Sequence, residues 1–565
     1  MMKKYIIAIL IAALGFSSCT EDVLDVTSNS LTVENWYKTA DDFQMAINSC
    51  YVTMLGKGLH GRVYPMFFGV WDDRTLFETT GRDRLTTNSS DGEVEDVFDE
   101  LFQGVYRTSK VIEQLYEKGV DGIEGMTQEN YDYIEAQARA LRALYYFHLV
   151  IVFDRPFFYN ETNIPVDLLY KFSNADQLEL WDQIETDLDL AIPALKPKSA
   201  TPPDEVGRIT SGAAQSLLGK ALLFKHYYYH ARFGQSGSPE DIADLEKAAE
   251  SLRTVINSNE YELILPMEPK SRDDYLYALL SNSSFKDLPA GDNLYKSENN
   301  AESVWEVQFS DAPMLQNNPW LPGYFGSGSL NMQFFSPHET SYRNIEAHPA
   351  MYYEFETTGA PAPFDRDPRC FATFYFDGEM MDFNPESPYH SALTPGTNYK
   401  EIASGRKLNV PVVTEGLVIK KHYFPVYWEG DNAPFNDPTN KRLIRFADVL
   451  LLYAETMYHL TDDGTGLNAL NRVRARVDMP SVPALSVEAI IHERDVELAY
   501  EYHRWFDLVR WSFDSEWATD WNEIEWGINA MNSVNPFVVG KHEFLPIPLK
   551  EIDLSDGNLE QNPGW

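Results

Sequence analysis

The sequence predicts a mostly α-helical protein, in which degenerate tetratricopeptide-type helix pairs form a scaffold and a loop-rich middle lobe carries few short strands. Segments near both ends of the chain have apolar residues at three- and four-residue spacings, as one face of a helix requires. Small residues on these segments, such as Ala213 and Ala248, let paired helices approach closely. Proline, glycine, asparagine and serine interrupt the pattern in the middle of the chain.

The helical pattern is clearest in a set of segments from both ends of the chain. These predicted helices span 131–153, 209–230, 243–257, 442–460, 467–477 and 487–511. The strict consensus of tetratricopeptide repeats is absent, so we interpret the helix pairs as degenerate repeats. Tyr227, Tyr228 and Tyr229 continue the amphipathic pattern of their segment, and we expect these rings to pack inside the scaffold.

The middle of the chain has a different character. We predict one large domain over 31–565, with a helical scaffold over about 31–260 and 441–565 and a loop-rich lobe over about 261–440. Within the lobe, 303–309 is predicted to be a strand, whereas turn-forming residues predict loops at 311–331 and 359–370. Long loops in a compact domain are often functional, and the aromatic content of these loops argues against disorder.

Residues 1–18 have the composition of a lipoprotein signal peptide. Two lysines precede a short apolar run from Tyr5 to Phe16, and a membrane-spanning helix needs about 20 apolar residues. The small residues before Cys19 resemble a bacterial lipobox, in which the cysteine is acylated and becomes the mature N-terminus. We therefore expect a lipid on Cys19 and an acidic lipid-anchored tether over 19–30. An ordinary signal peptide with an incidental cysteine is the alternative.

The charge of the chain argues against nucleic-acid binding, and the cysteines leave at most one disulfide. Asp and Glu number 86 against 46 Lys and Arg, which gives a formal net charge of −40. Nucleic-acid binding needs a basic surface, so we predict no nucleic-acid partner and a surface that disfavours strongly anionic ligands. Lipidation of Cys19 leaves Cys50 and Cys370, either as a disulfide or as two buried thiols.

Three glutamates near the end of the chain have helical spacing. Glu493, Glu497 and Glu501 stand at i, i+4 and i+8, which suggests either a metal or acid–base site or a set of ion pairs with nearby arginines. We favour the ion pairs. His492 and Glu493 open a zincin-like pattern, but Val496 occupies the position of the second histidine. P-loop and dinucleotide-binding patterns are also absent, so we predict no catalytic residue, no metal site and no cofactor.

Seven segments, in order along the whole chain, resemble the SusD/RagB family of outer-membrane nutrient-uptake lipoproteins. The most specific is Glu493–Trp511, with one departure at Tyr502, where glycine is more usual. The other segments are Trp36–Tyr51, Ala136–Phe153, Asp365–Arg369, Phe446–Glu455, Leu470–Arg474 and Leu545–Trp565.

The resemblance implies a SusD-like fold and a binding role rather than an enzymatic one. Members of the family lie on the outer membrane, lipid-anchored and facing the cell exterior, where they bind oligosaccharide or polysaccharide and deliver it to a partner TonB-dependent (SusC-like) barrel. Two alternatives remain: a peptide-binding member of the same family, and a lipid-anchored glycoside hydrolase, which would need two carboxylates in a cleft.

If the ligand is a glycan, aromatic rings in loops should stack on the apolar face of its sugars, beside polar groups that bond the hydroxyls. Two segments offer this combination. One carries Trp71, Asp72 and Arg74, near the region where family members have ligand-contacting residues, and the other carries Trp320 and Tyr324. We predict that these five residues bind the ligand, and that Trp71→Ala weakens binding without loss of fold.

Overall fold

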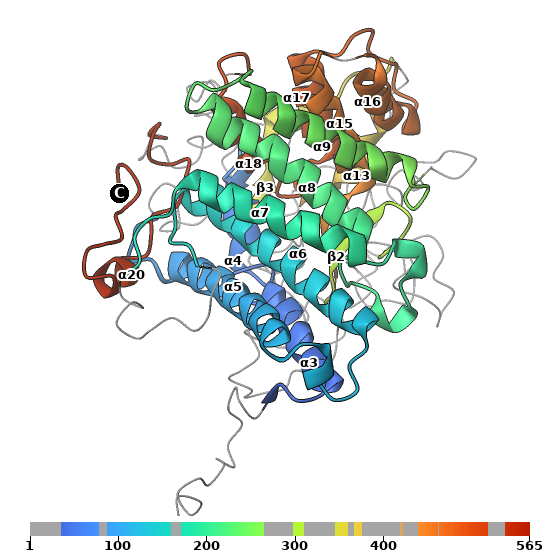
Figure 1. The fold of residues 1–565 in the computed structure, drawn as a ribbon. Helices are drawn as coiled ribbons and strands as arrows, with labels where there is room; N and C mark the ends of the chain where they lie inside the picture. Colours follow the sequence, from blue (N-terminus) through green and yellow to red (C-terminus); the bar gives the residue numbers. More distant parts are fainter. Residues whose placement is uncertain are drawn as a thin grey trace, which may run out of the picture.

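The structure is a computed structural model. It describes residues 36–69, 71–77, 87–159, 171–264, 298–309, 345–359, 366–375, 418–419, 421, 439–461, 463–517 and 537–565. Across these residues the protein is mostly helical, as predicted (Figure 1). None of the described helices combines the length and the apolar composition that crossing a bilayer requires.

The helices occur in two groups along the chain. The first group is α3 (Ala40–Val52), α4 (Val63–Phe68), α5 (Gly92–Lys118), α6 (Gln128–Phe153), α7 (Gln177–Ala191), α8 (Ser211–Lys225) and α9 (Pro239–Asn257). The later group is α12 (Pro349–Glu354), α13 (Pro368–Thr373), α15 (Phe446–His459), α16 (Thr465–Arg476), α17 (Val487–Glu497), α18 (Arg504–Ser512) and α20 (Leu549–Leu554). A π-helix, η7 (His226–Ala231), extends α8. Single 3-10 turns lie at Thr53–Leu55, Val120–Gly122, Ile192–Ala194, Lys198–Ala200 and Pro203–Glu205.

Successive helices pack side by side into an array. Helix α5 packs on α6, α6 on α7, α7 on α8 and α8 on α9, and α15 then packs against both α9 and α16. Figure 1 shows α5 to α9 next to one another in chain order, from the blue lower edge to the green upper part. This succession of neighbouring helices confirms the tetratricopeptide-like scaffold.

The sequence determines both the starts of these helices and their close approach. Side-chain oxygens cap the first backbone N–H groups of α5 to α9, from Asp91, Thr127, Asp176, Thr210 and Ser238. A Cβ on Gly104 of α5 would lie 2.5 Å from the Tyr145 ring of α6, and one on Gly219 of α8 would lie 2.5 Å from the Leu252 side chain of α9. Glycine is therefore required where these helices meet.

The core between the helices is rich in aromatic side chains. Tyr227 and Tyr228 are fully buried, as predicted, whereas Tyr229 is partly buried and packs against the edge of the core. Cys50 and Cys370 are both buried and are not joined by a disulfide, so the alternative of two separate thiols is correct.

The described strands form three antiparallel pairs. These are β1 (Thr75–Phe77) with β3 (Ile345–Ala347), β2 (Ser303–Val307) with β6 (Lys441–Arg445), and β4 (Phe374–Tyr375) with β5 (Val418–Ile419). Strand β2 confirms the strand predicted within 303–309. The helix predicted from 442 is wrong at its start, because pairing with β2 holds 441–445 extended before α15 begins at Phe446.

Two other predicted elements differ from the structure. The single helix predicted over 487–511 is wrong, since α17 ends at Glu497 and α18 begins at Arg504. Tyr500 and Tyr502 between them have φ values of 61° and 67°, which a right-handed helix does not allow. The loop predicted over 359–370 is wrong at its end, where Asp367 caps α13.

The glutamates with helical spacing lie in a buried ion-pair network. Glu493 and Glu497 belong to α17 and Glu501 to the turn after it, so the three do not share one helix face. Their partners are Arg369 of α13, Lys421, Arg445 of β6, and Arg474 and Arg476 of α16. The structural interpretation of these glutamates is confirmed, although Arg369, Lys421 and Arg445 lie far from the glutamates in the sequence.

The centre of this network is Glu497. Its carboxylate accepts hydrogen bonds from Arg445 Nη1 at 2.6 Å, from Arg369 Nη1 at 3.0 Å, and from Arg476. Burial opposes the charged form of Glu497, but the three guanidinium groups outweigh it and hold its pKa well below the usual range. The carboxylate is therefore ionised and neutralises arginines from three separate segments.

We expect Glu497→Gln to lower the free energy of unfolding by about 3 to 5 kcal/mol, because it leaves buried arginines without their counter-charge. Urea denaturation followed by circular dichroism measures this change. Glu488→Gln is the matched control, since Glu488 is exposed on the same helix, and it should change stability by less than about 0.5 kcal/mol. Equal stability of the two variants would contradict the central role of Glu497.

Candidate functional site

The structure places Trp71 in the core. Its ring is 5% exposed, stacks on Phe67 with ring centroids 4.9 Å apart, and meets the edges of Phe68 and Trp505 at 5.6 and 5.5 Å. A ring covered in this way presents little surface for a sugar to stack on. In this conformation, Trp71 serves to pack α4 against α18.

Asp72 is also buried, and it stabilises the turn into β1. Its Oδ1 accepts hydrogen bonds from the Thr75 hydroxyl at 2.8 Å and from the backbone N–H of Arg74 at 2.9 Å. These bonds explain the presence of an aspartate at this position without a role in ligand binding.

Arg74 lies nearer the surface, with a side chain that is 15% exposed. Its Nη2 donates to Asp495 Oδ2 at 2.5 Å and to Glu354 Oε2 at 3.2 Å. Burial opposes its charge, but Asp495 and the neighbouring Asp73 outweigh that effect and raise the pKa of Arg74. The guanidinium is therefore held beside α12, whose Glu354 it bonds.

Trp320, Tyr324 and Cys19 lie outside the described residues. Strand β1 follows Trp71–Arg74 directly and pairs with β3. Phe77 of β1 and Ile345 of β3 are register partners.

Next to this strand pair, α12 presents an aromatic surface. Tyr353 is 51% exposed, and the rings of Tyr352 and Tyr353 meet edge to face with centroids 5.4 Å apart. The Arg366 guanidinium lies over both rings, 4.2 Å from the centroid of Tyr352 and 5.4 Å from that of Tyr353. Arg366 Nη1 also donates to the Phe355 carbonyl at 2.8 Å, which fixes the guanidinium against the rings.

Polar groups lie beside these rings. His492 of α17 joins two carboxylates, through Nδ1 to Glu354 Oε1 at 2.9 Å and through Nε2 to Glu356 Oε1 at 3.0 Å. Burial disfavours the charged imidazole, but the two carboxylates outweigh it and raise the pKa of His492. The hydrogen bond from His492 in turn lowers the pKa of Glu354. Both carboxylates are about one-third exposed.

We call Tyr352, Tyr353, Glu354, Glu356, Arg366 and His492 the α12 surface. It combines an exposed ring with fixed donors and acceptors, which is the combination that recognition of a sugar requires. Arg74 is the one predicted site residue that the structure shows in contact with this surface, through Glu354. Tyr352 and Tyr353 were not among the residues predicted from the sequence to bind ligand. The sequence pattern that could have identified them is the tyrosine pair followed closely by Glu354 and Glu356.

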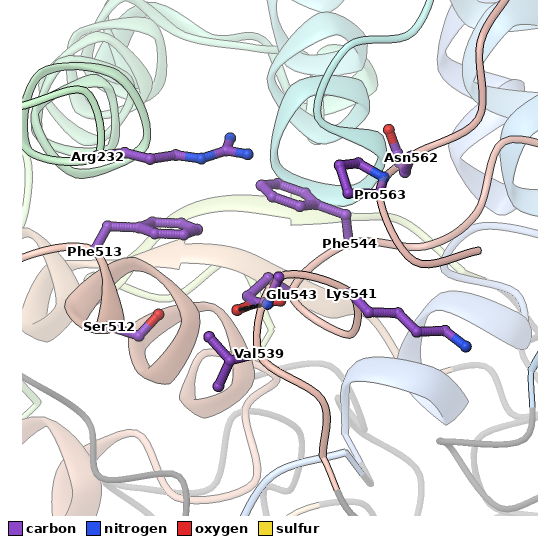
Figure 2. Close-up of a pocket in the computed structure, with 10 residues that line it drawn as sticks. Arg232, Ser512, Phe513, Val539, Lys541, Glu543, Phe544, Asn562 and Pro563 are labelled. Atoms are coloured by element: carbon purple, nitrogen blue, oxygen red, sulfur yellow. Dashed lines mark hydrogen bonds between the residues drawn. The ribbon is translucent and has the colours of Figure 1, made fainter.

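A hollow of about 250 Å³ lies between the end of α18 and the C-terminal segment. In Figure 2, Phe513 and Phe544 extend toward each other beside Arg232, and their nearly parallel rings have centroids 6.2 Å apart. Arg232 pairs with Asp154, with 2.6 Å between Nη1 and Oδ1, so its charge is already neutralised. The Oε2 atom of the buried Glu543 has no hydrogen-bond partner among the described residues, and burial raises the pKa of this carboxyl.

Two family models match the sequence. The model of the SusD family matches residues 301–565, and a model described as "Starch-binding associating with outer membrane" matches residues 22–230. The chain belongs to the SusD/RagB family. The glycine usual at Tyr502 in this family agrees with the positive φ found there.

Relatives of similar length share this membership. The chain is 23% identical to SusD-like protein P25 of Formosa agariphila, over 96% of this chain and 95% of the relative. It is 24% identical to a SusD-like protein of Bacteroides ovatus, over 90% of this chain and 83% of the relative.

Solved structures confirm the fold. A laminarin-binding SusD-like protein is 22% identical, with a TM-score of 0.66 over 94% of this chain and 100% of the other. Surface glycan-binding protein A of Bacteroides thetaiotaomicron, solved with laminarihexaose, is 19% identical, with a TM-score of 0.66 over 93% of this chain and 100% of the other. The mostly α SusD-like fold predicted from sequence is therefore correct.

The burial of Trp71 changes the outcome expected for its substitution. We expect Trp71→Ala to lower the free energy of unfolding by about 3 to 5 kcal/mol, because it leaves a cavity among Phe67, Phe68 and Trp505. Denaturant titration measures this loss. Tyr353→Ala, at an exposed ring, should change stability by less than about 0.5 kcal/mol. A stable Trp71→Ala variant that has lost ligand affinity would instead restore Trp71 as a binding residue.

Proposed function

We propose that this SusD/RagB family member is a lipid-anchored protein of the outer membrane, facing the cell exterior, that binds a neutral oligosaccharide or polysaccharide. It then delivers this ligand to a partner TonB-dependent (SusC-like) barrel. The description of the family model as starch-binding and outer-membrane-associated supports this role, as do the laminarin and laminarihexaose ligands of its structural relatives. The net charge of −40 favours a neutral glycan over an anionic one.

The observation that carries the proposal is the α12 surface. The half-exposed ring of Tyr353 can stack on the C–H face of a pyranose, while the carboxylates of Glu354 and Glu356 accept hydrogen bonds from its hydroxyls. His492, through hydrogen bonds, and Arg366, through its contact with the Tyr353 ring, fix these groups before a ligand arrives, which reduces the entropy lost on binding. Trp320 and Tyr324 remain proposed ligand contacts.

We propose binding without catalysis. Glu493, Glu497 and Glu501 neutralise arginines or a lysine inside the protein, and the carboxylates of the α12 surface are bonded to His492. A hydrolase would need one carboxylic acid to protonate the leaving group and a second carboxylate to act as nucleophile or base. The lowered pKa values of Glu354 and Glu356 are opposite to what the acid requires.

Laminarin is the first ligand to test, by isothermal titration calorimetry and affinity gels. We expect binding, and we expect Tyr353→Ala to weaken it about fivefold, since a stacked ring is worth on the order of 1 kcal/mol. Tyr106→Ala is the matched control, because Tyr106 is similarly exposed at 46% on α5, and it should leave the affinity unchanged.

Other outcomes of this experiment identify the alternatives. Binding of peptides, with no binding across a panel of neutral glycans, would move the protein to the peptide-binding branch of the family. New reducing ends in the presence of the protein would instead support the glycoside hydrolase. Equal loss of affinity in Tyr353→Ala and Tyr106→Ala would contradict the assignment of the α12 surface.

The lipid anchor has a separate test. We expect Cys19→Ala to move the protein from the outer-membrane fraction to the soluble fraction, because the thiol that accepts the lipid is removed. Cell fractionation followed by immunoblotting measures the distribution. Cys50→Ala serves as the control, since Cys50 is buried in α3. Membrane retention of Cys19→Ala would show that the lipid is not the anchor.

A further inference from the structure

Three potential metal ligands meet where three scaffold elements end or begin. His226 is the first residue of η7, His459 is the last residue of α15, and Asp514 lies in the turn after α18. One ligand atom of each residue lies within 4.8 Å of those of the other two. The imidazole rings of His226 and His459 have centroids 4.3 Å apart. Side chains far apart in the sequence are thus gathered at one point.

His226 presents one unpartnered nitrogen to this point. Its side chain is 2% exposed, and its Nδ1 lies 2.7 Å from Asp241 Oδ1. The bond to this carboxylate places the proton of a neutral imidazole on Nδ1 and leaves the lone pair on Nε2. Nε2 is buried, has no hydrogen-bond partner among the described residues, and lies 3.7 Å from Asp514 Oδ2.

His459 is oriented by a similar hydrogen-bond chain. The Tyr227 hydroxyl donates to Glu455 Oε1 at 2.7 Å, so its oxygen can accept a hydrogen bond from His459 Nε2 at 2.8 Å. The ring of Trp517 lies nearly parallel to the imidazole, with centroids 5.4 Å apart. Both histidines are therefore fixed by groups behind them, as histidines that bind metals usually are.

The spacing suits a small cation. A hydrogen bond between His226 Nε2 and Asp514 Oδ2 would be shorter than their 3.7 Å separation. A tetrahedral metal with bonds of about 2.0 to 2.2 Å holds two ligand atoms about 3.4 Å apart. All three separations are within 4.8 Å, so the widest must shorten by at most about 1.4 Å to reach this value when a metal binds. Asp514 and His459 are half-buried, which leaves access for a water ligand.

We infer that His226, His459 and Asp514 form a binding site for a divalent transition metal of the zinc class. Two imidazoles with one carboxylate suit Zn²⁺, whereas Ca²⁺ and Mg²⁺ prefer oxygen ligands throughout. The metal joins η7, α15 and the end of α18, so its role is structural. This site was not found from the sequence, because its ligands share no local spacing.

A proton is the competing occupant. Burial disfavours a charged His226, but Asp241 and Asp514 outweigh it and raise the pKa of the imidazole. A protonated His226 between two aspartates would satisfy the same charges without a metal. Zinc uptake distinguishes the two, because a site that holds only a proton would not bind zinc.

The test uses the full chain, purified without a polyhistidine tag and stripped of metal with a chelator. Titration with ZnCl2 in a calorimeter should show one equivalent bound, and the thermal unfolding temperature should rise with zinc. CaCl2 should produce neither effect. Asp514→Asn and His459→Gln should weaken zinc binding at least about tenfold.

His230→Gln is the matched control. His230 lies in the same π-helix, is equally buried and bonds Asp244 instead of facing the cluster, so this variant should bind zinc like the parent protein. If the ligand variants fail to fold, the visible spectrum of the parent protein with Co²⁺ decides, because tetrahedral nitrogen and oxygen ligation gives intense bands. Absence of zinc uptake, unchanged uptake in both ligand variants, or an equal response to calcium would overturn the metal site.

Discussion

The buried carboxylate of Glu497 is the interaction on which the rest of the structure depends. It joins arginines from α13, β6 and α16, elements that are far apart in the sequence. Arg445 and Arg476 also share Glu302, beside β2. Because desolvation of so many charges offsets much of their attraction, the network's main contribution is to specify one arrangement of these segments. It attaches the described part of the middle lobe to the helical scaffold.

The same network extends to the surface. Glu493 pairs with Arg474, which also pairs with Glu356 of the α12 surface. Glu356 bonds His492, which in turn bonds Glu354. A continuous chain of charged contacts therefore runs from the core to the proposed ligand site. The polar groups beside Tyr353 are held by the contacts that hold the fold, so the site is organised without a ligand.

The scaffold was predictable because burial of one helix face leaves a period in the sequence, which α9 carries clearly. Helices α6 and α8 are instead apolar and buried along most of their length. The site was not predictable. Trp71 lies next to charged residues in the sequence, which made it resemble a stacking ring, but those charges bond the turn and one another while the indole enters the core. Tyr353 is exposed because Met351 of α12 and Phe355, directly after this short helix, take the buried positions.

Helix α15 connects the buried ion-pair network with the proposed metal site, whose members could not be grouped from the sequence alone. Its N-terminus follows Arg445, in the ion-pair network, and its last residue is His459, in the proposed metal site. Between them, Glu455 binds Arg510 of α18 and accepts a hydrogen bond from Tyr227 of η7. Charged groups thus fix both ends of one apolar helix, and only the end near Arg445 leads to the α12 surface. A metal at His459 would therefore stabilise the scaffold without organising the proposed glycan site.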